Sequence, residues 1–77
     1  MKRRASELQV GDVIIDRSTR PLTVTTEPMA TKYRGQHPGW RIKVSDGYPA
    51  LVVKGDPEIT IADDPEEAWN EYAKFRA

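Results

Sequence analysis

The chain has 77 residues, enough for one domain, and a core of this size supplies only about 3–5 kcal/mol unless something else staples the fold. It has no cysteine and one histidine, which excludes disulfides, thiolate metal sites and a multi-histidine zinc site within one chain. Twelve Lys/Arg balance twelve Asp/Glu, but residues 1–54 carry ten of these cations and five of the acids, whereas residues 55–77 carry two and seven. This separation indicates a polar partner, or pairing of the two ends within or between chains.

Membrane insertion and secretion are not expected. No apolar run approaches the roughly 18–20 residues that span a bilayer, and no hydrophobic stretch follows the basic residues 2–4, as a signal peptide requires. We therefore expect a soluble cytoplasmic protein without a cofactor, a metal or a small-molecule substrate.

The N-terminal third predicts an arm followed by two strands. Residues 1–5 read as a frayed basic arm, and the pair Gly11-Asp12 predicts a reversal of the chain. The β-branched run at 13–16 and the alternating run at 22–26 predict strands, and Pro28 ends the second one.

The middle of the chain is partly ambiguous. Residues 29–39 fit a strand, a binding loop or a disordered stretch; within them, 31–34 fit a short edge strand and 35–39 a turn that contains His37. Residues 40–45 predict the clearest strand, with Trp40 and Ile42 on one face and Arg41 and Lys43 on the other. A hairpin turn at 46–47 and strands at 51–54 and 58–61 follow.

The C-terminal tail predicts an amphipathic helix over residues 64–76. Asp64 provides an N-cap, Pro65 suits the first helical position, and Glu67 lies three residues after the cap. Such a helix is too short to be stable alone in water, so its apolar face must dock on the sheet or on another molecule. Its aromatic residues share that face: Trp69, Tyr72 and Phe75.

Several short strands and one terminal helix predict a mainly β fold. We expect a single domain over 1–77, with a basic arm (1–5), a small SH3-like barrel or curled antiparallel sheet of five to six strands (6–62) and the helix (63–77). The predicted core comprises Leu8, Val13, Ile15, Leu22, Val24, Trp40, Ile42, Val44, Leu51, Val53, Ile59, Ile61, Trp69, Tyr72 and Phe75.

One resemblance supports this fold class, and a second is a resemblance of composition only. The run Leu8-Gln9-Val10-Gly11-Asp12-Val13-Ile14 resembles the L-x-x-G-D entry into the first strand of small SH3-like barrels, including translation domains of the elongation factor P type. This resemblance covers about seven residues and carries over no functional residue. The chain that follows lacks the Gly-Lys-rich loop of the ribosomal type. In length, absence of cysteine, Asp and Arg content and acidic helical tail, the chain also resembles small orphan proteins encoded by actinobacteriophages.

Basic residues form the first candidate site. Arg41 and Lys43 alternate on one strand, Lys32 and Arg34 on a neighbouring segment, and aromatic residues lie between them. Cations for phosphates and aromatics for bases are typical of a nucleic-acid surface, whereas the alternative is a solvated outer face with Trp40 in the core. The candidate nucleic-acid-binding set is Arg41, Lys43, Lys32, Arg34, Lys2, Arg3 and Arg4.

Aromatic residues form a second candidate site, a protein interface. The helix face can close the sheet or form a dimer seam, and the acids of residues 63–71 fit either helix capping or a docking site for a basic partner. The candidate interface set is Trp69, Tyr72, Phe75, Tyr33 and His37.

The sequence favours a binding module over an enzyme. His37 is the only histidine, and no nucleophile motif, phosphate-binding glycine loop or paired metal ligand accompanies it. The leading hypothesis is protein–protein interaction, as in a phage accessory protein acting on a host complex. The alternative is a nucleic-acid-binding barrel, which the acidic helix opposes unless it faces away. Head-to-tail self-pairing of the oppositely charged portions is a third hypothesis.

Overall fold

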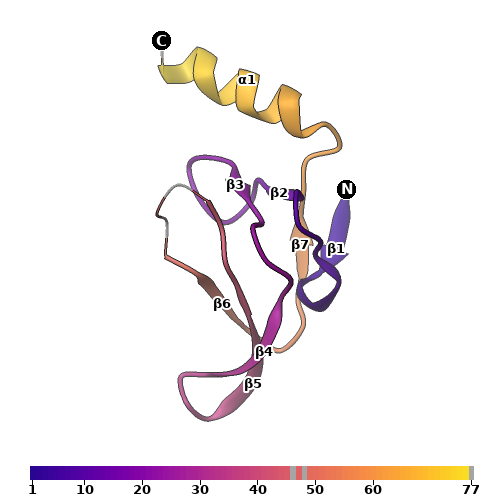
Figure 1. Cartoon of the computed structure of the whole chain (residues 1–77), viewed down its shortest axis with the longest axis vertical. Coiled ribbons are helices and arrows are strands. Elements are labelled where there is room, and N and C mark those ends of the chain that lie inside the picture. The colour runs from indigo at the N-terminus through magenta and orange to yellow at the C-terminus, as the bar shows by residue number, and fades with distance from the viewer. Residues whose placement is uncertain (46, 48, 77) are drawn as a thin grey trace.

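A computed structural model describes residues 1–45, 47 and 49–76, with side chains up to residue 74. As predicted, the chain is mainly β with one C-terminal helix (Figure 1). The elements are β1 (Lys2–Arg4), a 3-10 helix η1 (Ala5–Glu7), β2 (Val13–Ile14), β3 (Leu22–Thr23), β4 (Met29–Tyr33), β5 (His37–Ile42), β6 (Leu51–Lys54), β7 (Glu58–Thr60) and α1 (Pro65–Arg76).

The described strands form three small antiparallel sheets and no closed barrel. These sheets are β1–β7, β2–β3 and β4–β5–β6. Two isolated bridges join them, Ile14 to Ile61 and Val24 to Val44. The seven short strands exceed the five to six expected because β1 was not anticipated. Two of the predicted strands, 13–16 and 22–26, are shorter than expected.

The prediction of a frayed N-terminal arm is wrong. Lys2, Arg3 and Arg4 form β1 and pair with β7, with Lys2 opposite Thr60 and Arg4 opposite Glu58. The backbone of Ile61 also donates to the carbonyl of Met1 at 2.8 Å. Three consecutive cations carry no strand pattern, and the partner that orders them lies almost sixty residues away along the chain.

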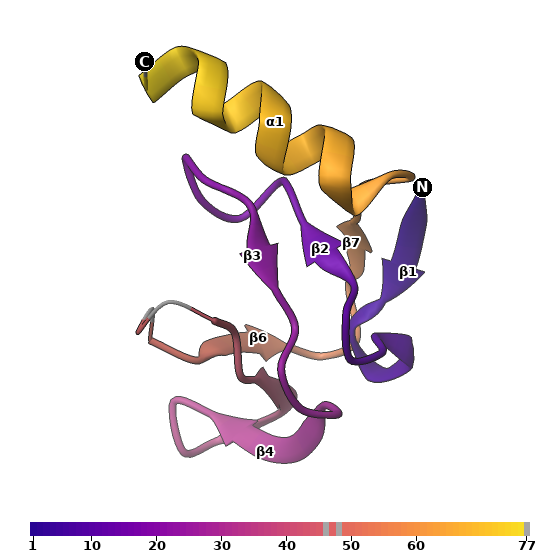
Figure 2. The ribbon, with the colours of Figure 1, turned by 45° about the horizontal axis from the view of Figure 1, so that its top comes forward.

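Residues 29–39 form a hairpin, which resolves the ambiguity of this segment. β4 begins at Met29, and β5 begins at His37 rather than after the predicted turn. Arg34 and Gly35 have φ values of 53° and 73°, the signs that a type I′ turn requires, and the Gln36 N–H donates to the Tyr33 carbonyl at 3.2 Å. The hairpin extends to the end of the molecule opposite α1 (Figures 1 and 2).

The hydrophobic core lies between the sheets. Most predicted core positions of the strands are buried, and Trp40, Leu51 and Val53 are half-buried and pack against them. Ala5, which we did not predict, is fully buried. The core cluster comprises Ala5, Leu8, Ile14, Leu22, Val24, Ile42, Val44, Ile59 and Ile61.

The prediction that Ile15 lies in the core is wrong. Ile15 is 44% exposed, whereas Ile14 is fully buried in the core cluster. Val13 is also buried, but outside that cluster. Alternation of side chains from Val13 predicted that Ile15 points into the core. β2 ends at Ile14, however, where it bridges Ile61, and this pairing determines which side chains face the core.

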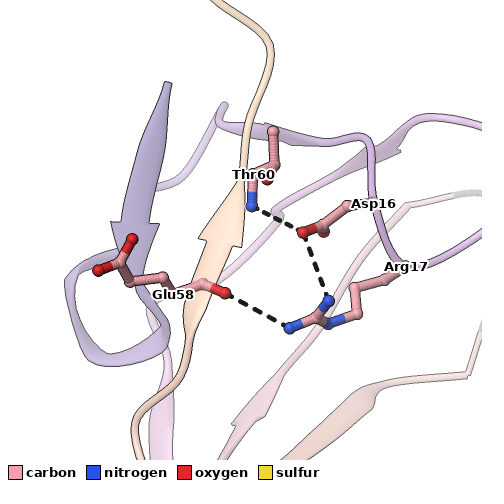
Figure 3. Close-up of polar contacts among 4 residues, drawn as sticks. All are labelled: Asp16, Arg17, Glu58 and Thr60. Carbon is pink, nitrogen blue, oxygen red and sulfur yellow. Dashed lines mark hydrogen bonds and ion pairs between the residues drawn. The ribbon is translucent and has the colours of Figure 1, made fainter.

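Side chains complete the junction between β2 and β7 beyond the end of β2 (Figure 3). The Asp16 carboxylate accepts a hydrogen bond from the Thr60 N–H at 3.0 Å. Arg17 pairs with Asp16 at 3.4 Å and donates to the Glu58 carbonyl at 3.5 Å. These side-chain contacts replace strand pairing beyond the end of β2. β7 is therefore bonded to β1 on one side and to the segment that follows β2 on the other.

Helix α1 crosses one end of the molecule near β2 and β3 (Figure 2). Trp69 and Tyr72 are half-buried and meet edge to face, with ring centroids 6.1 Å apart. Neither belongs to the core cluster, so their predicted core role is wrong, and the Phe75 side chain lies outside the described residues. Within the described residues no helix combines the length and the apolar character needed to cross a membrane.

Candidate functional site

The β4–β5–β6 sheet has an unusual charge composition. Its strands read MATKY, HPGWRI and LVVK, which include Lys32, Arg41 and Lys54 and no carboxylate. The sheet therefore has a positive field that no acid on its own strands offsets.

Strand register brings three cations onto one exposed face: one from β5, one from β6 and one from the residue just after β5. Arg41 lies opposite Met29 on β4 and Val52 on β6, and Lys54 lies opposite Gly39 in the next row. Lys43 follows Arg41 by two residues and so points to the same side. We call Arg41, Lys43 and Lys54 the basic sheet face.

The basic sheet face also carries exposed apolar surface. Met29 is 59% exposed and Val52 is 43% exposed, and they lie on either side of Arg41. An open depression of about 260 Å³ lies beside Arg41 and Lys43 and is lined further by Thr25, Val44 and Ala50. The face thus offers a mixed surface of positive charge and apolar contact.

Two aromatic rings lie at the hairpin end of the same face. Tyr33 and His37 are directly opposite each other, two rows beyond Arg41. Tyr33 is half-buried, and the Arg34 guanidinium lies 5.4 Å from the centre of its ring. This contact holds the Arg34 side chain beside the Tyr33–His37 pair of the hairpin.

The three cations of the basic sheet face are available for a ligand. All are exposed, and none forms an ion pair with another described residue. Among the described residues, an incoming anion would therefore meet no ion-pair partner that it had to displace.

The structure divides the predicted basic set. Lys32 lies opposite Pro38, on the side of the sheet that carries Trp40, and Arg34 lies in the turn. Arg41 and Lys43 do share an exposed face, as alternation predicted. β5 and β6 approach each other closely at Gly39. A Cβ at this position would collide with the backbone carbonyl of Val53.

The N-terminal cations mostly serve the fold. Arg3 pairs with Asp12 at 3.6 Å, and Arg4 donates to the Asp56 carbonyl at 3.5 Å. Lys2 is exposed, but β1 pairs with β7 and does not adjoin the basic sheet face.

The predicted protein-interface residues do not gather. Tyr33 and His37 lie in the β4–β5 hairpin, whereas Trp69 and Tyr72 lie on α1 at the other end of the molecule (Figure 1). The fifth residue, Phe75, has its side chain outside the described residues.

Sequence reasoning missed Lys54 as a site residue. The alternation in Leu51-Val52-Val53-Lys54 placed Lys54 on the outward side of its strand, and the expected pairing of residues 51–54 with 40–45 placed it near Arg41. The predicted two-residue turn at 46–47 pairs residue 45 with 48, and therefore Arg41 with Val52 and Gly39 with Lys54, which is the register observed. The sequence thus contained the signal that places Lys54 beside Arg41.

The described residues contain no group of three His, Asp or Glu side chains that could hold a metal ion. No protein-family model, curated protein or solved structure matches this chain.

Proposed function

We propose that the protein is a non-enzymatic module that binds single-stranded nucleic acid on the basic sheet face. The observation that carries the proposal is the convergence of Arg41, Lys43 and Lys54 on a sheet whose strands lack carboxylates. All three are exposed, and none forms an ion pair with a described residue. Cations in such an array neutralise phosphates and release counterions.

A single strand suits this face better than a duplex. Unpaired bases can stack on Tyr33 and His37 and contact the apolar side chains of Met29 and Val52, which share the face by register. A duplex would present only its phosphates to a short sheet and would leave these apolar contacts unused.

The position of α1 removes the main objection to a nucleic-acid ligand. The helix carries Glu66, Glu67 and Glu71, but it lies at the end of the molecule opposite the β4–β5 hairpin (Figures 1 and 2). The cations of the β4–β5–β6 sheet therefore lie apart from these carboxylates, although the formal charge of the whole chain is zero. The local field at the basic sheet face governs binding there.

We also infer that the fold is an open relative of a small SH3-like barrel. The bridges from Ile14 to Ile61 and from Val24 to Val44 give a continuous succession from β7 through β2 and β3 to the β4–β5–β6 sheet. Small barrels of this kind commonly bind ligands on a sheet face.

Fluorescence anisotropy with labelled mixed-sequence DNA, single-stranded and duplex, tests the proposed function. We expect tighter binding of the single strand and a slope of log K against log salt of about −2, since each of three phosphates contributes about −0.7. The triple variant Arg41→Ala, Lys43→Ala, Lys54→Ala should lose binding at physiological salt.

Lys32→Ala is the matched control, because it removes one cation from the same sheet but from the other side. It should bind single-stranded DNA about as well as the parent protein. The nucleic-acid function would be refuted by no binding at low salt, or by equal losses in the control and in an Arg41→Ala single variant. In that case the same face remains a candidate for an acidic protein partner.

A further inference from the structure

We propose that the tip of the β4–β5 hairpin docks into a groove beside α1 of a second copy, giving an antiparallel dimer. This contact uses Lys32 and Arg34 and none of the three cations of the basic sheet face. It shares the Tyr33 ring with the proposed base-stacking site, so dimerisation and stacking on that ring exclude each other. The sequence suggested self-pairing of the two charged portions as a third hypothesis, and this proposal assigns that pairing to specific residues.

The groove lies between the N-terminal half of α1 and the segment that follows β2. Its apolar floor comes from Ile15, Ala62 and Ala68, and Ile15 is 44% exposed. Such exposure of a large β-branched side chain beside a helix leaves apolar surface uncovered. Its rim carries the carboxylates of Asp63, Asp64, Glu67 and Glu71.

Some of these carboxylates have internal roles. Asp64 caps α1 by accepting from the Glu66 and Glu67 N–H groups at 3.1 and 3.3 Å. Asp63 meets the N-terminal ammonium at 3.1 Å, and Glu71 meets Lys74 at 3.4 Å in an exposed pair. Glu67 has no ion-pair partner among the described side chains, so the rim keeps an uncompensated negative charge.

The hairpin tip has the complementary chemistry. Lys32 and Arg34 are exposed and form no ion pair with another described residue. Arg34 is held at a positive φ of 53° in the turn, with its guanidinium over the Tyr33 ring. A projecting cationic tip with an aromatic ring matches a concave site that has an apolar floor and an acidic rim.

The geometry makes a second copy the occupant. The molecule extends 42 Å along its longest axis, and the hairpin and α1 lie at its two ends (Figures 1 and 2), so one chain cannot bring its own tip to its own groove. Two copies side by side in antiparallel orientation place each tip against the other copy's groove. Both contacts then form at once, and the assembly closes at two subunits.

Sedimentation velocity on the full chain, without nucleic acid, tests the dimer. At low salt the mass should shift with concentration from 8.7 kDa toward twice that value, and high salt should weaken dimerisation by about tenfold or more. A monomer at every concentration, or growth beyond two subunits, would overturn the proposal.

Charge reversal identifies the contact. Lys32→Glu with Arg34→Glu reverses the tip, and Glu67→Lys with Glu71→Lys reverses the groove. Each double variant alone should be monomeric, whereas an equimolar mixture of the two should form the dimer again, because each tip then faces a groove of opposite sign.

Two controls keep this test specific. Glu66→Lys changes the helix charge outside the groove lining, and Lys43→Glu changes the basic sheet face; both should still dimerise. A mixture of the reversed variants that stays monomeric refutes the tip-to-groove contact. Nucleic-acid binding by the groove-reversed variant, whose hairpin tip and basic sheet face are unchanged, then reports separately on the proposed function.

Discussion

The carboxylate of Asp56 ties the N-terminal 3-10 helix to the turn between β6 and β7. The Ser6 hydroxyl donates to it at 2.7 Å and the Ser6 N–H at 2.9 Å. These hydrogen bonds, the hydroxyl first, lower the pKa of Asp56, and the nearby Arg4 adds to the effect. Because Ala5 beside Ser6 is fully buried, this contact positions one end of the core.

The lowered pKa of Asp56 predicts a loss of stability in acid. The unfolded carboxyl has a pKa of about 4. A folded-state pKa below that value gives stabilisation that is present above about pH 4 and is lost as the pH falls through the folded pKa. Asp56→Asn should therefore lower the urea midpoint at neutral pH and flatten its acid dependence. Ser6→Ala should flatten it as well, and an unchanged acid slope in both variants would contradict the assignment.

The neighbouring isoleucines of β2 give a direct test of its register. Ile14→Ala removes a fully buried core side chain and should lower the free energy of unfolding by about 2–5 kcal/mol. Ile15→Ala, at the position we expected to be buried, should change it by less than about 0.5 kcal/mol. Urea denaturation measures both, and equal costs would show that the register is different.

Local patterns predicted where most strands lie, though not the bounds of 22–26 and 40–45, and failed where order depends on distant partners. Residues 51–54 form a strand with the predicted bounds, and residues 58–61 and 64–76 lie within a residue or two of theirs. β1 and the start of β4 lack alternating apolar residues, so only their pairing with β7 and β5 reveals them. Similarly, alternation placed Arg41 and Lys43 together, but the hairpin register that separates Lys32 from them was not readable.

Helix α1 is expected to unfold separately from the sheets. It contributes no residue to the core cluster, and its first turn depends on the Asp64 cap. Asp64→Ala should destabilise the helix by about 1 kcal/mol, whereas Asp64→Asn retains an oxygen acceptor and should cost less. Far-UV circular dichroism reports the loss of helix. Amide exchange at Ile42 reports the core and should be unchanged, and accelerated exchange there would show that α1 supports the sheets.

At the scale of the whole molecule, part of the charge split seen in the sequence becomes a spatial separation, whereas the cations of β1 lie against β7 of the acidic portion. The sequence predicted two oppositely charged portions but not that the basic hairpin and acidic helix lie at opposite ends (Figure 1). That arrangement depends on the path of β7, which returns the chain to β1 and β2 before α1 begins. It leaves both charged regions accessible, so one chain can offer two separate interaction surfaces.

The pairing of β1 with β7 also determines when the protein can fold. Lys2 lies opposite Thr60, and the core cluster joins Ala5 and Leu8 to Ile59 and Ile61. During synthesis, no emerging part of the chain can complete this core until residue 61 has left the ribosome. Because such pairings close nearly the whole chain into a loop, folding should take on the order of milliseconds to seconds rather than microseconds. Until then β1 stays unpaired, and the nascent chain exposes the apolar residues that β7 later covers.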